Sequence, residues 1–516
     1  MTWVNTGGAI SGGGVTNSPY ASEAEVQALK TDGLAGGAIQ ITATGTSTTK
    51  SAGDWAKSGP LDASATSVTS TGGSTKTLGT WMAQLDATGT PSATTYLRGD
   101  KTWAAVTSGY NTTPEANGAA GDWNGVTGTD DTAAIQAAVN TGKPVYFAAR
   151  YKLTGTLTLP QGAVLFGRGN RGVGTGDSPQ LVQTTMGVPT LLIPAGSNGV
   201  VIRDLSVQYN GTALPGGNAL EIRGTVTTPT KSIAVDNFLA LGAWKGIYLS
   251  GNLVVSSNFT KIVVGNSQDA GIHVEGAING TTPHIANAFS QLVLDGGLAS
   301  ATSIGLRFTG SVESAKVSDA EIINWNKGVS IDSPGAHGTY DAEPSWLRFS
   351  NIVVDGNVSN GISITAGQML AFSNSIVTGT GRGTIGAQGI YTGNVAEIVF
   401  LGVQSIQNGN HGWYLDTGTV RARLIGCAGS SNGVVAAGSS GALVLPGVSD
   451  FVIQGGSYTQ ISGITTWTTI RQDYGVTVRP GASDRYIIAD NLTSGNNLGG
   501  VSDGGTGVNK RVANNY

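Results

Sequence analysis

One short pattern, a glycine followed by alternating apolar and polar residues, recurs seven times in the middle of the chain. Its copies begin at Gly246, Gly271, Gly305, Gly328, Gly361, Gly389 and Gly412. The alternation predicts strands with one buried face and one wet face. The copies are separated by roughly 23 to 34 residues, which is typical of stacked coils rather than of one globular core.

A second pattern lies upstream of the glycines and fixes the register of the repeat. The segments FTKIVVGN, FSQLVLDG and FSNIVVDG begin at Phe259, Phe289 and Phe349. Each coil therefore contains at least two strands, joined by corners rich in Asn, Gly, Ser and Asp. The pattern predicts an all-β parallel solenoid. The residues expected to stack in one interior column are Ile272, Leu306, Val329 and Ile362.

The composition excludes several classes of protein. The net charge of −4 gives no electrostatic footprint for binding nucleic acid. No apolar run is long enough to cross a membrane, and the first residues do not resemble a secretory signal. The single cysteine, Cys427, is expected to be buried and inert, and the scattered histidines suggest no metal site. We therefore expect no cofactor.

The N-terminal region, residues 1 to about 110, differs from the rest of the chain. It is rich in Gly, Ser, Thr and Ala, with one plausible helix at Ser22–Lys30 and otherwise short strands and turns. Because its apolar surface is too small for a large core, we expect it to pack against another chain.

The solenoid is expected to begin behind a linker and a capping helix, in residues 111–142. The segment from Thr129 to Val139 has an acidic first turn, with Asp130 as the expected N-cap, and Gly142 follows as a stop signal. A helix there would cover the open edge of the first coil. The coils themselves are expected over residues 143–480, with a closing segment at 481–516.

Three segments carry a resemblance to a known family. Thr129–Gly169 resembles the opening of the pectate-lyase-like, right-handed β-helix proteins of phage tailspikes. Gly89–Trp103 is similar to a motif that precedes the receptor-binding parts of phage tail fibres and tailspikes, and Asp484–Asn515 is similar to the end of many such β-helices.

The resemblance implies a virion-attached homotrimer on the phage tail that acts at the host cell surface. It implies that residues 1–110 dock on tail or baseplate proteins. It also implies that the β-helix binds, and often cleaves, a bacterial surface polysaccharide, either capsule or O-antigen. No catalytic residue can be carried over, because these enzymes place their acids differently from one subfamily to the next.

The alternation also predicts which side chains point outward. The first outward column is expected to contain Glu221, Tyr248, His273, Arg307, Ser330, Ser363, Tyr391 and Tyr414. A second column, one step along each strand, is expected to contain Arg223, Ser250, Glu275, Thr309, Asp332 and Thr365, with Asp416 further down. A linear glycan needs such a strip, in which aromatic rings stack on sugars and polar groups bind hydroxyls. The alternative is an ordinary wet β-face, which prefers the same residue types.

Within these columns, Glu275 and Asp332 are the candidate catalytic pair. They are expected two coils apart, or about 10 Å at the backbone. Flexible carboxyl tips at that spacing can reach the roughly 6.5–9.5 Å of an inverting glycosidase. The alternative is a surface salt bridge between Arg307 and one of the acids.

A rival group of carboxylates is Glu321 with Asp295 and Asp355. The two aspartates occupy equivalent positions, and Glu321 is expected about 8 Å from each. Both aspartates precede a glycine, however, so each is also a turn signal.

A long insertion, residues 333–346, carries two more candidate glycan contacts, Tyr340 and Trp346. The alternative is a loop that packs between the subunits of a trimer.

Two main functions and one weaker one follow. The first is a polysaccharide depolymerase that hydrolyses glycosidic bonds with paired carboxylates. The second is a non-catalytic adhesin that binds the same glycan or a protein receptor. The third is a polysaccharide lyase, which needs Arg or Lys as a base.

Overall fold

The structure is a computed structural model of the chain. It describes residues 111–167, 180–277, 283–297, 300–333, 343–381, 386–435, 437–460 and 472–516, and the backbone of six strands before residue 111. The chain divides into two units, Met1–Gly109 and Tyr110–Tyr516.

The first unit contains a four-stranded sheet and a hairpin. The sheet has the order β2-β1-β3-β4, and β5 pairs with β6 in the hairpin. The strands are β1 (Ala38–Ala43), β2 (Trp55–Leu61), β3 (Ser67–Thr69), β4 (Thr75–Thr77), β5 (Thr95–Leu97) and β6 (Trp103–Ala105). The helix expected at Ser22–Lys30 lies outside the described residues.

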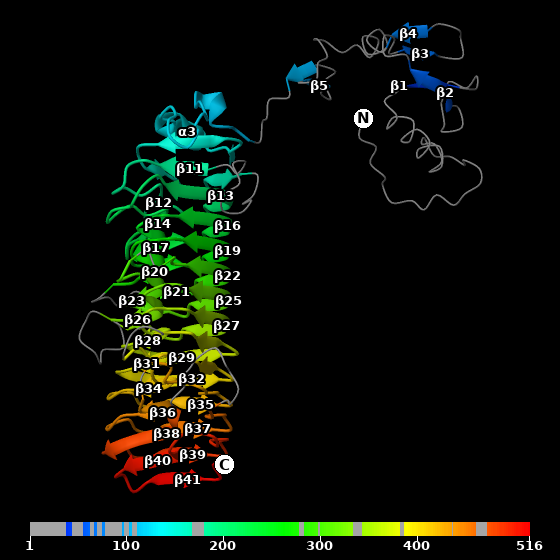
Figure 1. Cartoon of the computed structure of the whole chain (residues 1–516). Helices are drawn as coiled ribbons and strands as arrows, with labels where there is room; N and C mark the ends of the chain where they lie inside the picture. The colour runs from blue at the N-terminus through cyan, green and yellow to red at the C-terminus, as the bar shows by residue number, and fades with distance from the viewer. Residues whose placement is uncertain are drawn as a thin grey trace. The chain divides into compact units, whose positions relative to one another are not determined.

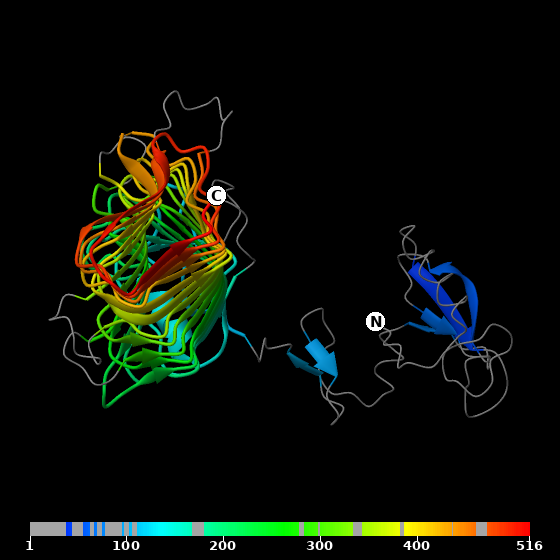
Figure 2. The same ribbon diagram turned by 90° about the horizontal axis from the view of Figure 1, so that it is seen from below.

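The second unit is the predicted right-handed parallel β-helix, in which successive coils stack along one axis (Figure 1). Every strand pairing within this unit is parallel in the part of the chain that the structure describes, and two long sheets follow the axis. Seen from below, the coils lie over one another around a common interior (Figure 2). The fold class predicted from the glycine repeat is therefore confirmed.

The strands group into three sheets. The 13-stranded sheet contains β9 (Leu157–Thr158), β12 (Leu191–Ile193), β14 (Leu220–Gly224), β17 (Lys245–Gly251), β20 (Ala270–Glu275), β23 (Ile304–Thr309), β26 (Lys327–Asp332), β28 (Ile362–Ile364), β31 (Ile390–Thr392), β34 (Trp413–Leu415), β36 (Ser439–Val444), β38 (Gln472–Gly481) and β40 (Gly499–Gly505). The 18-stranded sheet contains β7 (Val145–Tyr146), β8 (Arg150–Leu153), β10 (Val164–Phe166), β11 (Gln180–Gln183), β13 (Val201–Tyr209), β16 (Ala234–Leu241), β19 (Asn258–Gly265), β22 (Ala288–Asp295), β25 (Lys316–Ile323), β27 (Arg348–Asp355), β29 (Gly367–Ser373), β30 (Ile376–Thr378), β32 (Val395–Leu401), β33 (Gln404–Ile406), β35 (Arg423–Ile425), β37 (Val452–Gln454), β39 (Tyr486–Ala489) and β41 (Lys510–Ala513). A short four-stranded sheet contains β15 (Thr230–Lys231), β18 (Val254–Val255), β21 (His284–Ile285) and β24 (Val312–Glu313).

Left-handed corner residues bend the longer strands of the 18-stranded sheet. In β19 the corner is Lys261, which has a φ of 53°. The pairing with β22 skips this residue, passing from Thr260 to Ile262. Asn237 and Asp319 form the same corner in β16 and β25. Asn and Asp tolerate this conformation better than most residues, which explains why the corners are rich in them.

The repeated glycine is explained by crowding inside the coil. A Cβ added to Gly246 would lie 2.5 Å from Val264 Cγ1 and 2.6 Å from the carbonyl oxygen of Gly271. A Cβ added to Gly305 or Gly328 would meet the same two kinds of neighbour. One is a side chain of the 18-stranded sheet, and the other is the carbonyl oxygen of the next glycine in the column. Only a residue without a side chain fits where the 13-stranded sheet approaches the 18-stranded sheet this closely.

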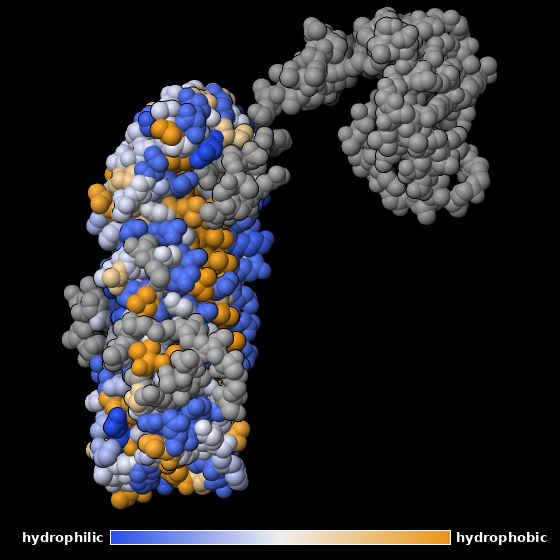
Figure 3. All heavy atoms as spheres, viewed as in Figure 1, coloured by the Kyte–Doolittle hydropathy of each residue, from blue (hydrophilic) through white to orange (hydrophobic). Residues whose placement is uncertain are grey.

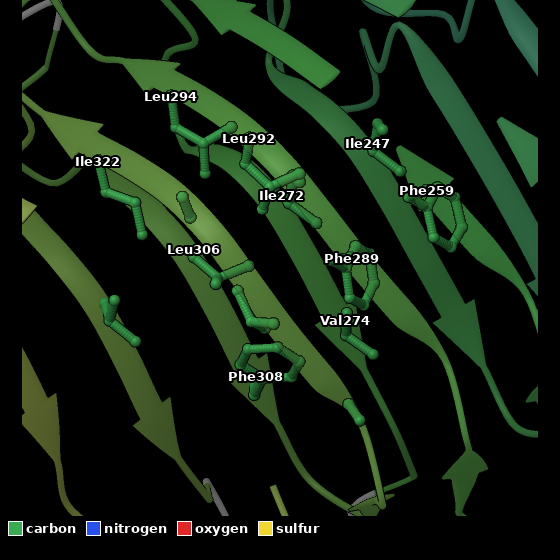
Figure 4. Packing of buried hydrophobic residues seen from close by; sticks show 14 of the residues in the cluster. Ile247, Phe259, Ile272, Val274, Phe289, Leu292, Leu294, Leu306, Phe308 and Ile322 are labelled. Carbon is green, nitrogen blue, oxygen red and sulfur yellow. The ribbon is translucent and has the colours of Figure 1, made fainter. Parts of the chain in front are cut away.

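The predicted interior column forms. Ile272 pairs with Leu306, Leu306 with Val329, and Val329 with Ile362, and all four side chains are fully buried. Figure 4 shows Ile272 and Leu306 in the interior with aromatic side chains from the facing strands. Phe259 and Phe289 stack there with ring centroids 4.7 Å apart. Cys427 is buried, and burial raises the pKa of its thiol to about 11.

Helix α3 (Thr132–Asn140) and the short helix η2 (Glu115–Asn117) precede the first coil. Ile135, Ala138 and Val139 are buried, as the apolar pattern predicts. The N-cap, however, is Asp131 rather than Asp130. Asp131 accepts hydrogen bonds from the backbone of the preceding linker, and Asp130 accepts one from the Thr132 amide at 3.1 Å. Asp131 thus anchors the linker, and Asp130 accepts a hydrogen bond from a backbone amide at the start of the helix.

The coils continue to β41, beyond the end expected near residue 480. Strands β39, β40 and β41 stay in the same two sheets as the strands before them. No helix among the described residues is long and apolar enough to cross a membrane.

Candidate functional site

The outward columns of the 13-stranded sheet have the predicted register. Glu221 pairs with Tyr248, Tyr248 with His273, and His273 with Arg307. The column continues through Ser330, Ser363, Tyr391 and Tyr414. We call this column, together with the second column that contains Glu275, Thr309, Asp332 and Asp416, the strip.

The strip is less exposed than the alternation predicts. Glu221 and His273 retain 6% and 4% of their accessible surface, and Ser330 and Ser363 retain 2% each. Side chains of adjacent coils cover one another, since neighbouring strands lie only about 4.8 Å apart. The polar groups of the strip are therefore held in place by their neighbours rather than freely solvated.

Tyr248 and Glu275 form the first cluster on the strip. The Tyr248 hydroxyl donates a hydrogen bond to Glu275 Oε2 in the next coil. The ammonium group of Lys245 lies 4.3 Å from the centroid of the Tyr248 ring and 3.2 Å from Asp269 Oδ2. Burial and the Glu275 carboxylate raise the pKa of Tyr248, so the tyrosine remains a hydrogen-bond donor at neutral pH.

His273 is a neutral, buried member of the strip. Its Nε2 lies 2.8 Å from Thr309 Oγ1 and its ring lies 5.4 Å from that of Tyr248. Burial, with the nearby charges of Lys245 and Arg307, lowers the pKa of His273 to about 2. Its Nδ1 is buried and has no hydrogen-bond partner among the described residues.

Asp332 lies on the opposite side of Thr309 from Glu275. Thr309 pairs with Glu275 in one coil and with Asp332 in the next, so the two acids are two coils apart, as predicted. Asp332 Oδ2 lies 3.5 Å from Arg307 Nε and accepts a hydrogen bond of 3.0 Å from Ser330. The salt bridge considered as the alternative thus forms, and Glu275 has no ion pair with a cation among the residues that the structure describes. Two carboxylates in unlike surroundings at this spacing are a suitable arrangement for acid–base chemistry.

Glu221 is held by its own neighbours. It accepts a hydrogen bond of 2.9 Å from Asn218 and forms an ion pair of 2.6 Å with Arg223. Its carboxylate therefore has fewer free acceptor positions for a glycan than the sequence suggests.

A second cluster lies lower on the strip, in β31 and β34. The rings of Tyr391 and Tyr414 stack with centroids 5.6 Å apart. The Tyr391 hydroxyl donates a hydrogen bond of 2.6 Å to Asp416. His411 lies beside Tyr414, with ring centroids 5.8 Å apart, and burial lowers its pKa to about 4.

The rival carboxylates lie on the 18-stranded sheet, so the two candidate groups do not combine into one site. Glu321 pairs with Val293 and Val353, which are each 38% exposed. Hydrophobic residues gather over β16 to β27 on this face (Figure 3).

The two aspartates of the rival group behave differently from each other. Asp295 accepts hydrogen bonds from the Gly297 amide and the Asn324 side chain, as expected of a turn residue. Asp355 Oδ1 is buried without a partner among the described residues.

Of the two residues chosen from the long insertion, Tyr340 lies outside the described residues. Trp346 is 47% exposed and occupies a left-handed corner with a φ of 57°, two residues before β27 begins at Arg348. Its amide donates to the carbonyl oxygen of Gln368. Trp346 thus belongs to the edge of the 18-stranded sheet and does not join the strip.

Three residues of the site were missed by the outward-column prediction: Lys245, Asp269 and His411. All three lie within two residues before a repeated glycine. That position is the signal in the sequence, because the chain enters the 13-stranded sheet there. No group of three His, Cys, Asp or Glu side chains in the described ranges is arranged to hold a metal ion.

No model of a known protein family matches the chain, and no curated protein matches it. Among solved structures, the chain is similar to the pre-mature gene product 12 of bacteriophage phi29, with 14% identity and a TM-score of 0.48 over 72% of this chain and 52% of that protein. It is similar to the A-module of the mannuronan C-5 epimerase AlgE4 of Azotobacter vinelandii, with 14% identity and a TM-score of 0.48 over 78% of this chain and 99% of the module. It is also similar to tailspike protein 3 of bacteriophage CBA120, with 12% identity and a TM-score of 0.48 over 92% of this chain and 74% of the tailspike. The chain thus spans about half the length of the phi29 protein.

Proposed function

We propose that this protein is a phage tailspike that binds a bacterial surface polysaccharide along the strip and hydrolyses it with Glu275 and Asp332. The observation that carries the proposal is the column that joins Glu275, Thr309 and Asp332. This column places two carboxylates on one outward face, about 10 Å apart at the backbone. The carboxyl groups of inverting glycosidases are about 6.5–9.5 Å apart, and side-chain rotation spans the difference.

The two acids have different roles in this proposal. Asp332, whose oxygen faces the positive charge of Arg307, is the general base that activates water. Glu275, which has no ion pair among the described residues, is the general acid that protonates the leaving oxygen. Tyr248, His273 and Arg307 position the sugar between them.

The resemblance of Gly89–Trp103 to tail-fibre and tailspike motifs supports placing the protein on the phage tail. In this proposal the first unit attaches to other virion proteins, the β-helix faces the host surface, and three chains form the native spike.

Incubation of the purified full-length protein with bacterial surface polysaccharide tests the function. New reducing ends without absorbance from a double bond support hydrolysis. Unsaturated uronate ends would instead identify a lyase. Binding without either product would identify an adhesin and overturn the catalytic part of the proposal.

A further inference from the structure

His411, in the second cluster of the strip, has a hydrogen-bond donor that the fold does not use. The side chain retains only 5% of its accessible surface. Its Nδ1 accepts a hydrogen bond of 2.9 Å from the Ser440 amide, so the proton of the neutral ring is on Nε2. No described residue accepts a hydrogen bond from Nε2, yet this atom is not fully enclosed, so a ligand can reach it.

An unused donor on a buried side chain is unusual, because buried polar groups are normally paired. His284 provides the comparison within this chain. Its Nδ1 also accepts from a backbone amide, that of Val254, but its Nε2 lies 2.9 Å from the carbonyl oxygen of Glu275. The fold thus satisfies both nitrogens of His284 and leaves one nitrogen of His411 free.

Two further donors beside His411 also lack acceptors. The ring centroid of Tyr414 lies 5.8 Å from that of His411, and its hydroxyl has no hydrogen bond to a described residue. Burial raises the pKa of Tyr414, so the hydroxyl keeps its proton. Arg479, on β38, is exposed and has no ion pair among the described residues, and its charge helps to lower the pKa of His411. We call His411, Tyr414 and Arg479 the lower site.

The carboxylate of this cluster, Asp416, is already engaged. Its Oδ2 accepts a hydrogen bond of 2.6 Å from the Tyr391 hydroxyl, and its Oδ1 accepts one of 2.7 Å from the Thr417 amide. The unused hydrogen-bonding groups of the lower site are therefore an imidazole N–H, a phenol hydroxyl and a guanidinium. A ligand that fits them supplies acceptor oxygens.

The lower site is separate from the proposed catalytic pair. Tyr414 is on β34, which is five strands from β20 with Glu275 and three strands from β26 with Asp332. At about 4.8 Å for each strand, these separations are about 24 Å and 14 Å along the axis. The lower site therefore contacts a different part of a glycan from the bond between the two acids.

We propose that the lower site is a second glycan-binding site, which holds a sugar unit by its acceptor oxygens away from the point of cleavage. This inference rests on the proposed function for its class of ligand, but it does not depend on the catalytic pair. A sugar carboxylate and the carbonyl of an N-acetyl group both offer such oxygens, and the experiment distinguishes them.

The test measures equilibrium binding of bacterial surface polysaccharide to immobilised full-length protein. His411→Asn keeps an acceptor for the Ser440 amide and removes the Nε2 donor, whereas His411→Gln places an amide donor near the position of Nε2. We expect about tenfold weaker binding for His411→Asn and for Arg479→Gln, and near wild-type binding for His411→Gln. Arg511→Gln is the control, because it removes an exposed arginine of β41 on the 18-stranded sheet and should change nothing.

The outcomes separate the inference from the proposed function. Wild-type affinity in both His411→Asn and Arg479→Gln overturns the second site and leaves the proposed function intact. Equal weakening by His411→Asn and His411→Gln overturns the role of the Nε2 donor. No binding by the wild-type protein overturns the proposed function as well. When the site is supported, an Arg479→Gln effect that is lost between about 0.05 and 0.5 M salt identifies a sugar carboxylate, and an effect that persists identifies a neutral carbonyl.

Discussion

His284 is a buried residue that connects the strip to the interior through hydrogen bonds of both its ring nitrogens. Its Nδ1 accepts a hydrogen bond of 2.9 Å from the Val254 amide, and its Nε2 lies 2.9 Å from the carbonyl oxygen of Glu275. Because Nδ1 is an acceptor, the ring is neutral with its proton on Nε2. His284 thus fixes the backbone that presents Glu275, without belonging to the strip itself.

The pH dependence of stability follows from this residue. Burial lowers the pKa of His284 to about 4 in the folded chain, below the ordinary value of about 6.5. Between these two values the unfolded chain binds more protons than the folded chain, so its stability must fall as the pH falls from about 6.5 toward 4. Urea unfolding at several pH values between 7 and 4.5 measures this slope.

The matched comparison for His284 uses two variants. His284→Gln should reduce the proton uptake on unfolding by about one. His411→Gln should do the same, since burial lowers the pKa of His411 to about 4 and its Nδ1 accepts from the Ser440 amide. An unchanged slope in both variants would show that neither imidazole is held neutral.

Substitution of Glu275 and Asp332 tests the proposed catalytic pair. Glu275→Gln and Asp332→Asn should each lower turnover by about 10²–10⁴-fold and leave glycan affinity nearly unchanged, because general acid–base catalysis acts in the transition state. Initial rates of reducing-end release and equilibrium binding measure the two effects. Glu321→Gln, on the other sheet, is the control. Wild-type turnover in both strip variants would reject the pair and move the search to Glu321, Asp295 and Asp355.

At the scale of elements, the stack depends on close approach between the two long sheets. The glycine column permits that approach, and the aromatic stack at Phe349 and Phe372, with centroids 4.3 Å apart, fills the interior beside it. The sheets are held apart by large residues at some positions and brought together by glycine at others. Each coil repeats this arrangement, so a defect in one coil is transmitted to its neighbours.

We expect Gly246→Ala to destabilise the β-helix by about 1–3 kcal/mol, the usual cost of overpacking. The added carbon would lie 2.5 Å from Val264 Cγ1. Gly187→Ala is the matched control, because its added carbon meets only the Pro215 carbonyl oxygen at 3.7 Å. Denaturant unfolding measures both variants. Equal stability of Gly246→Ala and the control would contradict the steric explanation of the repeat.

At the scale of the whole molecule, the two long sheets present different surfaces. The 13-stranded sheet carries the polar strip. The 18-stranded sheet exposes Val293 and Val353 beside Glu321. Exposed apolar residues beside a carboxylate are consistent with a surface that is covered in an assembly.

We therefore expect a trimer in which the face around Val353 is buried between subunits. Light scattering on the full-length chain at micromolar concentration should give three times the chain mass of 52.1 kDa. Val353→Asp should shift the equilibrium toward monomer, because it places a charge in a contact that excludes water. Val126→Asp, at a position 80% exposed in the linker, should leave the mass unchanged. A monomeric wild-type chain would contradict the expectation.

The sequence by itself determined the β-helix, the interior column from Ile272 to Ile362 and the outward order of the strip. These features depend on period and alternation, which are properties of neighbouring residues along the chain. The tertiary structure alone decided what covers each side chain. It buried Glu221 and His273, paired Tyr248 with Glu275 from another coil, and placed Trp346 at a corner away from the strip. Alternation indicates which side of a sheet a residue faces. The carboxylate partners of Tyr248 and Tyr391, in contrast, are 25 or more positions away in the sequence, and only the stacking of coils brings them together.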